Sequence, residues 1–368
     1  MSVLTLTVLA ERPESVIRSI EVVTPPDRRT GRKLKEISPS EYPILSILQQ
    51  KENREKTHHY LRMRTIRSVS LPSSADLSST GFDLGVVVSF GYFLPPHILH
   101  AFPKGVINVH PSLLPKYRGA APMQHTIMNG DVKTGVTVQE LDEKVFDAGK
   151  ILLQEEWKIP TDKPIMFDSL AGTLGLKGAT LLVKTLCNYD IYKENATTQV
   201  TTQVTHAPKI TKDMAFIDFE TMPAETIERL HRAIGHQYPI TTYYTLWRIK
   251  RSLKIKHKHI SMQLFNIYLP IKSPAHIAVP FPDPGTIFWD FDTKTMHVVC
   301  ADGNVIGLTH IKAESRKEIP AYDFFNGYSV RSGDGRFGAF DDESEIEPGK
   351  SGEEDEESGD KGKARGKT

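Results

Sequence analysis

The only dense grouping of side chains suited to catalysis in this 368-residue chain lies within residues 105–150. Asn108 and His110 stand two residues apart in the stretch VINVH, which reads as a buried β-strand. Side chains alternate between the two faces of a strand, so these two point to one face and the apolar residues around them to the other. Pro111 removes a backbone donor and ends the strand. The pair is therefore expected at the carboxyl end of a strand, where open α/β sheets bind ligands.

A carboxamide, an imidazole and a carboxylate together suit acyl transfer. The amide N–H of Asn108 can donate to a developing oxyanion, and His110 can accept a proton from an attacking amine. Asp147, in the tight turn FDAGK, is the candidate carboxylate that would hold the tautomer of the imidazole and favour its charged form. Other carboxylates nearby in sequence stand on more polar, exposed ground: Glu140, Asp142 and Glu143. Spacing alone fits a structural histidine as well as a catalytic one.

Several other kinds of site find no support in the sequence. No GxSxG elbow, GxGxxG turn after a strand or GxxxxGK[ST] loop occurs, which argues against a serine nucleophile, a dinucleotide site and a nucleoside triphosphate site. Cys187 and Cys300 are far apart and lack metal-ligand spacing, so we expect no disulfide scaffold and no metal. No apolar run reaches the roughly 18 residues of a membrane helix, so we expect no membrane partner.

Length and hydrophobic pattern predict an α/β domain followed by a β-rich domain. Segments typical of strands are 16–24, 84–90, 105–110, 135–141 and 151–159, whereas 43–69, 121–130 and 167–187 favour helices. After residue 206, short strands at 241–249, 252–268, 285–289, 295–300 and 305–311 lie between helices at 223–235 and 320–326, as in a small β-barrel. We place the domains at 1–187 and 207–335, a linker at 188–206 and a disordered acidic tail at 336–368.

The net charge of +1 conceals separate basic and acidic regions. Between residues 28 and 35, the loop after the first predicted strand carries five cations around one glycine, and a second basic run covers 248–258. The first run could equally contact a polyanion or be a solvated turn, whereas a run such as the second is usually a solvated face and is the weaker candidate for phosphate contact. The segment 341–357 is strongly acidic and is expected to be solvated.

Two blocks, NVHPSLLPKYRGAAPMQ and GVTVQELDEKVFDAG, resemble the signature of the formyltetrahydrofolate-dependent formyltransferases. The continuation RGAAP at 118–122 is similar to the methionyl-tRNA formyltransferases within that family. VVTPPDRRTGRKLK, VVVSFGYFLP and HAPKITKDMAFIDF resemble the basic loop of the family, its folate-side loop and the start of its C-terminal domain. The likeness covers residues 16–330 in stages, and the block at 108–149 is its most specific part.

The resemblance implies a doubly wound, mostly parallel Rossmann-like sheet followed by a small OB-like β-barrel. It also implies that Asn108, His110 and Asp147 catalyse formyl transfer from 10-formyltetrahydrofolate to the α-amino group of methionyl initiator tRNA, for translation initiation. His110 would accept the amine proton, Asn108 would stabilise the tetrahedral oxyanion and Asp147 would orient His110. Formyltetrahydrofolate would be a co-substrate, and no bound cofactor or metal is implied.

Further positions take their expected roles from the same resemblance. Residues expected to bind folate are Phe90, Gly91, Leu94, Pro95, Ser112, Leu113, Leu114 and Pro115, although packing alone would also explain the apolar ones. Residues expected to bind tRNA are Arg32, Lys33, Lys35, Lys209, Arg248, Lys250 and Arg251. Beyond tRNA and folate we expect no partner, and therefore a monomer.

The beginning of the chain departs from the family pattern. Family members begin with a short hydrophobic strand and a Gly-Thr-Pro-like turn before the first helix, whereas this sequence starts within what would be that helix. We therefore expect the first strand to be missing, either because the gene model is incomplete, which we favour, or because the protein is a weakened variant. The His236-Gln237 pair in RAIGHQYP resembles organellar members and implies a location in the mitochondrial matrix, with no presequence visible.

Two other functions stay open at the level of sequence. A folate-dependent formyltransferase could act on a small amine or sugar, but such a substrate needs neither the basic loop nor the second domain. Loss of the first strand could instead leave a nonenzymatic remnant that binds RNA.

Overall fold

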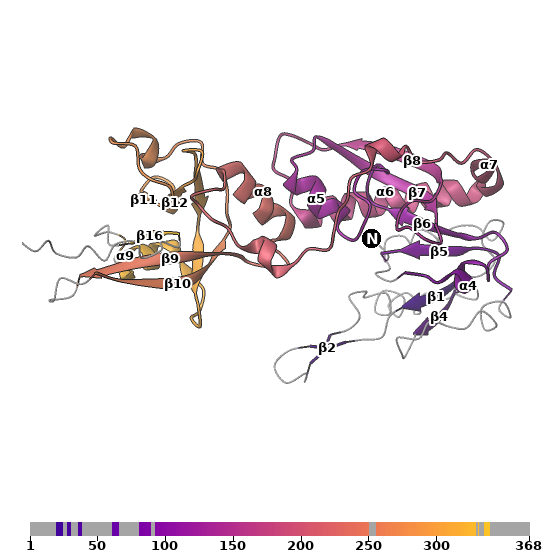
Figure 1. The fold of residues 1–368 in the computed structure, drawn as a ribbon, viewed down its shortest axis with the longest axis horizontal. Coiled ribbons are helices and arrows are strands. Elements are labelled where there is room, and N and C mark those ends of the chain that lie inside the picture. The colour runs from indigo at the N-terminus through magenta and orange to yellow at the C-terminus, as the bar shows by residue number, and fades with distance from the viewer. Residues whose placement is uncertain are drawn as a thin grey trace, which may run out of the picture.

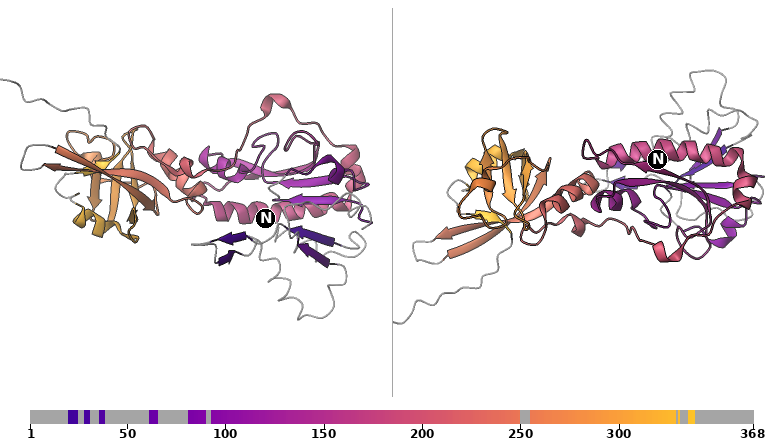
Figure 2. Two further views of the ribbon diagram at one scale, coloured as in Figure 1. Left: turned by 60° about the horizontal axis from the view of Figure 1, so that its bottom comes forward. Right: turned by 90° about the horizontal axis from the view of Figure 1, so that it is seen from above.

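The structure is a computed structural model of the chain. It describes backbone and side chains at residues 81–89, 93–246, 259–328, 330 and 335–338, and the backbone alone in the strand residues 20–24, 28–30, 36–38, 61–65, 247–249 and 255–258. The described elements form two groups that lie end to end, with helix α8 (Ala224–Ile234) between them (Figure 1; Figure 2). The first group precedes residue 207, and the second contains the strands after residue 239.

The first group is built on a four-stranded sheet. Its strands, in spatial order, are β5 (Gly85–Val88), β6 (Val106–His110), β7 (Lys133–Glu140) and β8 (Ile151–Lys158). β5 and β6 run parallel, whereas the β6–β7 and β7–β8 pairs are antiparallel. The expectation of a mostly parallel sheet is therefore wrong for these strands. Only residues 141–150 join β7 to β8, and a connection that short returns the chain in the opposite direction.

Backbone pairing is also present before residue 66. β1 (Ile20–Thr24) pairs in parallel with β4 (Leu61–Thr65), and β2 (Arg28–Thr30) pairs antiparallel with β3 (Glu36–Ser38). β1 agrees with the predicted strand. β4 is a strand inside a segment that we expected to be helical, and its sequence LRMRT alternates apolar and charged residues at the period of a strand. The expectations of a missing first strand and of an absent presequence concern the chain before β1, which lies outside the described residues.

Helix α6 (Phe167–Cys187) packs on the apolar face of the sheet, as its amphipathic pattern predicts. Leu170 and Leu182 of the helix are fully buried and join Ile107 and Val138 of the strands in one core. By length and composition alone α6 could cross a membrane, which the sequence analysis did not anticipate, but half of its most apolar stretch is buried inside the protein. Its contacts with three strands are those of a core helix.

The opposite face of the same sheet is polar. Asn108 and His110 on β6 pair with Gln139 and Thr137 on β7, and Gln154 on β8 continues the row. The loop after β6 folds over this face, because Thr137 bonds to its backbone. Three short helices complete the group: α4 (Pro96–Leu99), α5 (Pro122–Met128) and α7 (Tyr189–Glu194). The sheet thus separates a hydrocarbon core from a buried polar surface.

The segment predicted as a linker, 188–206, is attached to the first group along its length. It contains α7 and a short 3₁₀ helix, η2 (Thr201–Gln203). Thr197 exchanges two backbone hydrogen bonds of 2.9 Å with Ile151. Just beyond the segment, the backbone of Ala207 bonds to that of Arg118 at 2.8 Å. The domain boundaries themselves stay a prediction.

Helix α8, which agrees with the helix predicted at 223–235, packs against α5 and joins the two groups in one core. Arg232 Nη1 donates a 2.9 Å hydrogen bond to the carbonyl oxygen of Ile165, in the segment before α6. His236, from the pair that resembles organellar proteins, stacks on Phe167 with ring centroids 4.2 Å apart. The two groups are therefore in direct contact as well as covalently linked.

The second group consists of two antiparallel sheets. The larger has the order β15 (Ile319–Pro320), β14 (His310–Ala313), β10 (Ile255–Phe265), β9 (Ile240–Ile249) and β16 (Gly335–Phe337). The smaller contains β11 (Ile287–Asp290), β12 (Thr295–Val299) and β13 (Val305–Leu308), and α9 (Ala321–Gly327) packs beside both. Two isolated contacts bridge the sheets, Tyr268 to Gly307 and Phe337 to Gly285. The described strands do not form one closed sheet, so the OB-like barrel is not established.

A polar cluster in the second group surrounds His297 on β12, which is fully buried. Its Nδ1 lies 2.9 Å from Ser273 Oγ, and its Nε2 lies 3.2 Å from Thr295 Oγ1. Burial lowers the pKa of His297 below the ordinary value of 6.5, and the nearby charge of Asp290 opposes that shift. The folded protein therefore holds this ring in its neutral form near neutral pH.

This histidine should make the protein less stable in mild acid. The unfolded chain binds a proton at position 297 near pH 6.5, whereas the folded chain binds it only at a lower pH. As the pH falls below 6.5, proton binding therefore favours unfolding, and the free energy of unfolding decreases. We expect His297→Gln to reduce that decrease, measured by urea unfolding from about pH 7 to about pH 5.

Burial also lowers the pKa of His231 and His236, so the variant should remove only part of the decrease. The matched control is His97→Gln, at an exposed position, which should keep the pH dependence of the parent protein. If His297→Gln kept it as well, the buried ring would have no part in acid sensitivity.

Candidate active site

The structure brings the three predicted catalytic side chains together at the end of β6. Asp147 Oδ1 lies 3.4 Å from His110 Nδ1 and accepts a 3.3 Å hydrogen bond from Asn108 Nδ2. Only 9% of Asn108, 4% of His110 and 9% of Asp147 is exposed. Asn108 and His110 share one face of the strand, and the turn after β7 supplies the carboxylate. The arrangement has the geometry that the acyl-transfer interpretation requires.

The backbone of the turn FDAGK directs the carboxylate at the pair. Asp147 has a φ of 54°, in the left-handed region that aspartate tolerates better than most residues other than glycine. At Gly149 a β-carbon would lie 1.9 Å from the carbonyl oxygen of Glu140, so a larger residue cannot take this position without moving the backbone. The turn therefore closes against the end of β7 and holds Asp147 beside Asn108.

Hydrogen bonds fix the Asp147 carboxylate on both oxygens. Oδ1 accepts from Gln139 Nε2 at 2.9 Å in addition to Asn108. Oδ2 accepts from the backbone N–H of Gly119, also at 2.9 Å. A buried carboxylate is expensive unless donors surround it, and charge-assisted bonds of this kind are the stronger ones. These donors hold the Asp147 carboxylate in one orientation.

Both ring nitrogens of His110 face oxygen atoms. Nδ1 faces Asp147 Oδ1, and Nε2 lies 2.9 Å from the carbonyl oxygen of Tyr117. A neutral imidazole carries one N–H and can donate to only one of these acceptors, whereas the protonated ring can donate to both. The surroundings of His110 therefore suit a ring that takes up a proton during a reaction.

Three polar residues on β7 and β8 that the sequence did not single out support the site, and two of them hold the SLLP turn on the sheet. Thr137 Oγ1 donates to the Ser112 carbonyl oxygen at 2.7 Å and accepts from the Leu114 backbone N–H at 3.2 Å. Gln154 Nε2 donates to Thr137 Oγ1 at 2.8 Å and to the Leu114 carbonyl oxygen at 3.0 Å. The third, Gln139, bonds to Asp147 as described above. A signal for two of them was present, because GVTVQE places Thr and Gln at alternate positions of a strand that is otherwise apolar.

A tyrosine in the same loop supports the turn from its outer side. Tyr117 is buried, and its hydroxyl donates to Asp131 Oδ2 at 2.7 Å while accepting from Asn129 Nδ2 at 2.9 Å. Burial raises the pKa of Tyr117 to about 12, so the hydroxyl stays protonated and keeps donating. This anchor fixes the Tyr117 carbonyl group that faces His110.

Gln199 and Arg118 are two further residues at the site that the sequence analysis did not select. Only 5% of Gln199 is exposed, and its Nε2 lies 2.8 Å from the carbonyl oxygen of Asp147. Arg118 donates to Gln199 Oε1 from Nε at 3.1 Å and from Nη2 at 2.7 Å. Gln199 belongs to the Thr- and Gln-rich segment predicted as a linker, where nothing in the sequence separates it from its neighbours.

The predicted folate residues fall in two places. Leu94 and Pro95 are half-buried just before α4, and the next residue on their N-terminal side, Phe93, contacts the ring of Phe146 edge-on at 5.1 Å. Phe146 precedes Asp147, so the loop before α4 meets the turn that carries Asp147. Phe90 and Gly91 lie outside the described residues. Within the SLLP turn, Ser112 and Leu114 are buried, whereas Leu113 and Pro115 are half-buried. All of these except Ser112 border a cavity of about 420 Å³, which Lys133 and Gln154 also line.

Among the predicted tRNA residues, only Lys209 has a described side chain. It is exposed and follows Ala207, whose carbonyl oxygen accepts from the backbone N–H of Ala121 at 3.1 Å. This pairing brings Lys209 near the RGAAP motif. The positions whose side chains the structure does not describe are Arg32, Lys33, Lys35, Arg248, Lys250 and Arg251.

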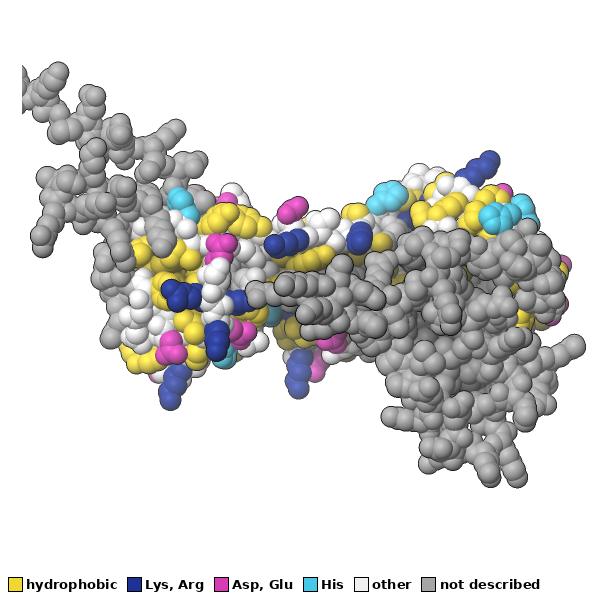
Figure 3. All heavy atoms as spheres, turned by 90° about the horizontal axis from the view of Figure 1, so that it is seen from below, with side chains coloured by type: hydrophobic (Ala, Val, Ile, Leu, Met, Phe, Trp, Pro, Cys, Tyr) yellow, Lys and Arg dark blue, Asp and Glu magenta, His cyan; other side chains and the backbone are white. Residues whose placement is uncertain are grey.

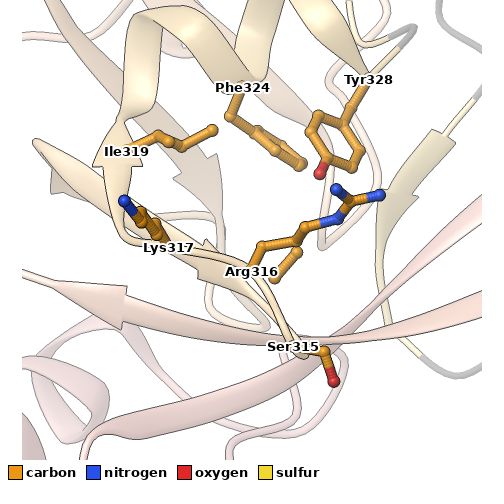
Figure 4. Close-up of a pocket in the computed structure, with 7 residues that line it drawn as sticks. Ser315, Arg316, Lys317, Ile319, Phe324 and Tyr328 are labelled. Atoms are coloured by element: carbon orange, nitrogen blue, oxygen red, sulfur yellow. The ribbon is translucent and has the colours of Figure 1, made fainter.

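A second cavity, of about 430 Å³, lies in the second group between the turn after β14 and helix α9 (Figure 4). Arg316 and Lys317 in this turn are exposed, and Arg316 extends toward the ring of Tyr328 (Figure 4). Tyr328 stacks on Phe324, with ring centroids 4.7 Å apart. The sequence analysis did not select this combination of cations and an aromatic surface.

Metal ligation finds no support among the residues whose side chains are described, where no group of three or more His, Cys, Asp or Glu side chains could hold an ion. Cys187 is exposed and Cys300 is buried, and neither is in a disulfide.

The first group is an α/β domain with its polar residues at the carboxyl end of β6, as in Rossmann-like folds. HypX from Aquifex aeolicus, solved in complex with tetrahydrofolic acid, has a similar fold, with a TM-score of 0.51 and 17% identity over 77% of this chain and 45% of that one. The formyl transferase family matches residues 6–166, and the C-terminal domain of formyl transferases matches residues 209–329.

Sequence relatives agree with these matches. The methionyl-tRNA formyltransferase of Enterococcus faecalis is 32% identical over 309 residues, which are 83% of this chain and 87% of that enzyme. The chain belongs to the formyltransferase family, which confirms the resemblance found in its sequence. The human mitochondrial methionyl-tRNA formyltransferase is 34% identical over 253 residues, or 69% of this chain. The match spans 61% of the length of that human relative.

We expect Thr137→Val to destabilise the protein by roughly 1–3 kcal/mol, because the change keeps the shape but leaves two backbone groups of the SLLP turn without their partner. Thr137 is fully buried, so water cannot replace the lost hydroxyl. The free energy of unfolding, measured with urea, checks this expectation.

Thr180→Val is the matched control, because Thr180 is exposed on α6 and its hydroxyl bonds only to the carbonyl oxygen one helical turn before it. This control should change stability by a few tenths of a kcal/mol at most. Equal effects of the two substitutions would contradict the view that Thr137 holds the turn.

Proposed function

We propose that the chain transfers a formyl group from 10-formyltetrahydrofolate to the α-amino group of methionine on initiator tRNA. The observation that carries the proposal is the meeting of Asn108, His110 and Asp147 on a buried polar surface, in a chain of the formyltransferase family. The relatives from Enterococcus faecalis and human both have methionyl-tRNA in their names.

The first step is attack of the amine nitrogen on the formyl carbon, which forms a C–N bond and places negative charge on the formyl oxygen. Asn108 supports this step because its Nδ2 carries two hydrogens and only one is used by Asp147. The second hydrogen can donate to the oxyanion in a site where little water competes. An oxyanion donor of this kind accelerates the reaction by roughly 10²–10³-fold.

His110 takes the proton that the attacking amine must lose. The protonated ring then donates both to Asp147 and to the Tyr117 carbonyl oxygen, so uptake of the proton completes two hydrogen bonds. When the tetrahedral intermediate collapses, the bond from the formyl carbon to N10 of folate breaks. The proton passes to N10, which leaves formylated methionyl-tRNA and tetrahydrofolate.

Two aromatic rings beside the catalytic turn support a folate site there. Phe93 is 39% exposed and Phe146 is 56% exposed, although both are large apolar side chains. Together with Leu94 and Pro95 they offer an apolar wall for the pterin ring next to Asp147. The SLLP turn borders the site from the strand side and is held by Thr137 and Gln154.

The second domain supports a large anionic substrate. Arg316 and Lys317 border one cavity with Tyr328, and the Arg316 side chain extends toward the ring of Tyr328, a combination that suits a phosphate and a base. Lys209 adds a cation near the catalytic domain. In the part of the face in Figure 3 whose residues are described, the cations lie scattered among acidic and apolar side chains.

The same proposal covers the wider organisation of the chain. It takes residues 1–187 as the catalytic domain, 188–206 as the segment that joins the domains, 207–335 as an OB-like tRNA-binding barrel and 336–368 as a tail. The protein would act as a monomer in mitochondria. The names of the human and bovine relatives, which include the word mitochondrial, support this location.

The leading test supplies labelled formyltetrahydrofolate with methionyl-tRNA or with small amines. We expect transfer to methionyl-tRNA, a loss of about 10²–10³-fold in kcat/KM for Asn108→Leu and a loss of about 10²–10⁴-fold for His110→Gln. His276→Gln, at an exposed position of the second domain, should retain the parent rate.

The other interpretations of the sequence predict different results in this assay. Labelling of small amines alone would identify a formyltransferase with a small substrate. Absence of transfer from a folded protein that still binds tRNA would identify an RNA-binding remnant, and His110→Gln would then leave that binding unchanged.

The basic turn of the second domain gives a separate prediction for tRNA. Replacing Arg316 and Lys317 with alanine should weaken tRNA binding and lower the slope of log Kd against log salt concentration by about 1 for each lost phosphate contact. Lys158→Ala, at an exposed position on β8, is the control and should keep the parent slope. An unchanged slope in the double variant would place tRNA elsewhere.

A further inference from the structure

We infer that Gln199 is a positioning residue of the active site, which holds the Asp147 turn at the distance from His110 that formyl transfer requires. The inference rests on the proposed function for its kinetic consequence. It assigns a catalytic task to the segment that joins the two domains, which the sequence describes only as polar.

The contacts of Gln199 converge on the turn. Its Nε2 lies 2.8 Å from the carbonyl oxygens of both Asp147 and Gly149. No other hydrogen bond between described residues reaches either of these two carbonyl oxygens. A buried carbonyl group without a donor lowers the stability of the fold by roughly 1–3 kcal/mol. By supplying donors to both groups, Gln199 stabilises the turn in the conformation that it adopts here.

Gln199 also reaches the carboxylate itself through Gln139. Its Nε2 also lies 3.2 Å from Gln139 Oε1, a longer contact that shares a hydrogen with one of the turn carbonyl oxygens, and the Gln139 amide nitrogen donates to Asp147 Oδ1 at 2.9 Å. Gln139 is fully buried, so no solvent competes for this amide. The main chain and the side chain of Asp147 are therefore both placed by the same glutamine.

Arg118 sets the direction in which the Gln199 amide points. An amide can be turned over at little cost when its two ends have equivalent partners. Here the two donors of Arg118 converge on Oε1, so only the NH₂ end can face the turn. Arg118 is the first residue of the RGAAP motif, and its role in this arrangement is to orient Gln199 without touching Asp147.

The surrounding chain holds Gln199 in place. Two residues before it, Thr197 pairs with Ile151, and six residues after it the carbonyl oxygen of Thr205 accepts from the Arg118 backbone N–H at 2.9 Å. The hydroxyl of Thr205 accepts from the Tyr117 backbone N–H at 2.9 Å. Gln199 thus stands between two fixed points, which is what a positioning side chain requires.

Two substitutions separate positioning from bulk stability. Gln199→Met removes every hydrogen bond of the side chain, whereas Gln199→Glu keeps an acceptor for Arg118 and removes the donor to the turn. We expect both to lower kcat by about 10- to 100-fold while KM for each substrate stays within about threefold of the parent value. Both variants leave the carbonyl groups of Asp147 and Gly149 without their donor, so both should lower the melting temperature, and kcat is measured well below it.

Gln237→Met is the matched control, since Gln237 is an exposed glutamine near the domain contact. It should retain the kinetic constants of the parent. A Gln199→Glu variant that keeps the parent kcat would overturn the inference. So would losses of kcat that merely follow losses of stability across the two Gln199 variants.

A double-mutant cycle tests whether Gln199 acts through Asp147. In the Asp147→Asn background, with single-turnover rates measured, Gln199→Met should slow transfer by less than about threefold, although it slows the parent by 10- to 100-fold. Effects of equal size in both backgrounds would mean that Gln199 does not act through Asp147.

Hydrogen exchange provides a readout that does not depend on formyl transfer. The Gly119 N–H is bonded to Asp147 Oδ2, so it should exchange faster in Gln199→Met than in the parent and in Gln237→Met. Unchanged exchange would overturn the inference even if the enzyme were active. Faster exchange in a chain that transfers no formyl group would support the positioning of Asp147 and reject only the proposed reaction.

Discussion

A single buried carboxylate, that of Asp147, determines much of the first domain. Donors from separate parts of the chain satisfy its two oxygens: Asn108 on β6, Gln139 on β7 and the Gly119 backbone in the loop after β6. Each donor has to be placed by its own element, so the register of β6 against β7, the course of the loop and the tightness of the turn all depend on one another. The arrangement that satisfies the charge also places it against His110.

The same sheet serves stability and chemistry on its two faces. Alternation along β6 sends Ile107 into the hydrocarbon core beneath α6 and Asn108 into the polar layer above. Because the period of a strand is two residues, a slip of one position would exchange the two layers and destroy both. Packing of α6 therefore protects the register on which the polar residues depend, although α6 itself contributes no group to the polar layer described here.

The sequence was most informative where a short periodic pattern decides the structure. Alternation identified the shared face of Asn108 and His110, and the amphipathic helix α6 was found with its bounds. The direction of β7 and β8 was missed because it depends on the length of a turn rather than on the composition of the strands. Gln199 was missed for a similar reason. Its role comes from a tertiary contact with the Asp147 turn, about 50 residues earlier in the chain, and the composition of a Thr- and Gln-rich segment does not indicate such a contact. Closure of the second domain likewise depends on contacts between distant strands.

The attachment of residues 197–207 to the first domain has a geometric consequence for any large ligand. The chain leaves its last backbone bond to the loop at Ala207, and α8 packs on α5 a short distance further on. The position and the orientation in which the second domain begins are therefore fixed relative to the Asp147 turn. If a molecule binds both domains, the distance between them fixes where its reactive end lies relative to the Asp147 turn. Length and shape would then select the substrate before any chemical group is examined.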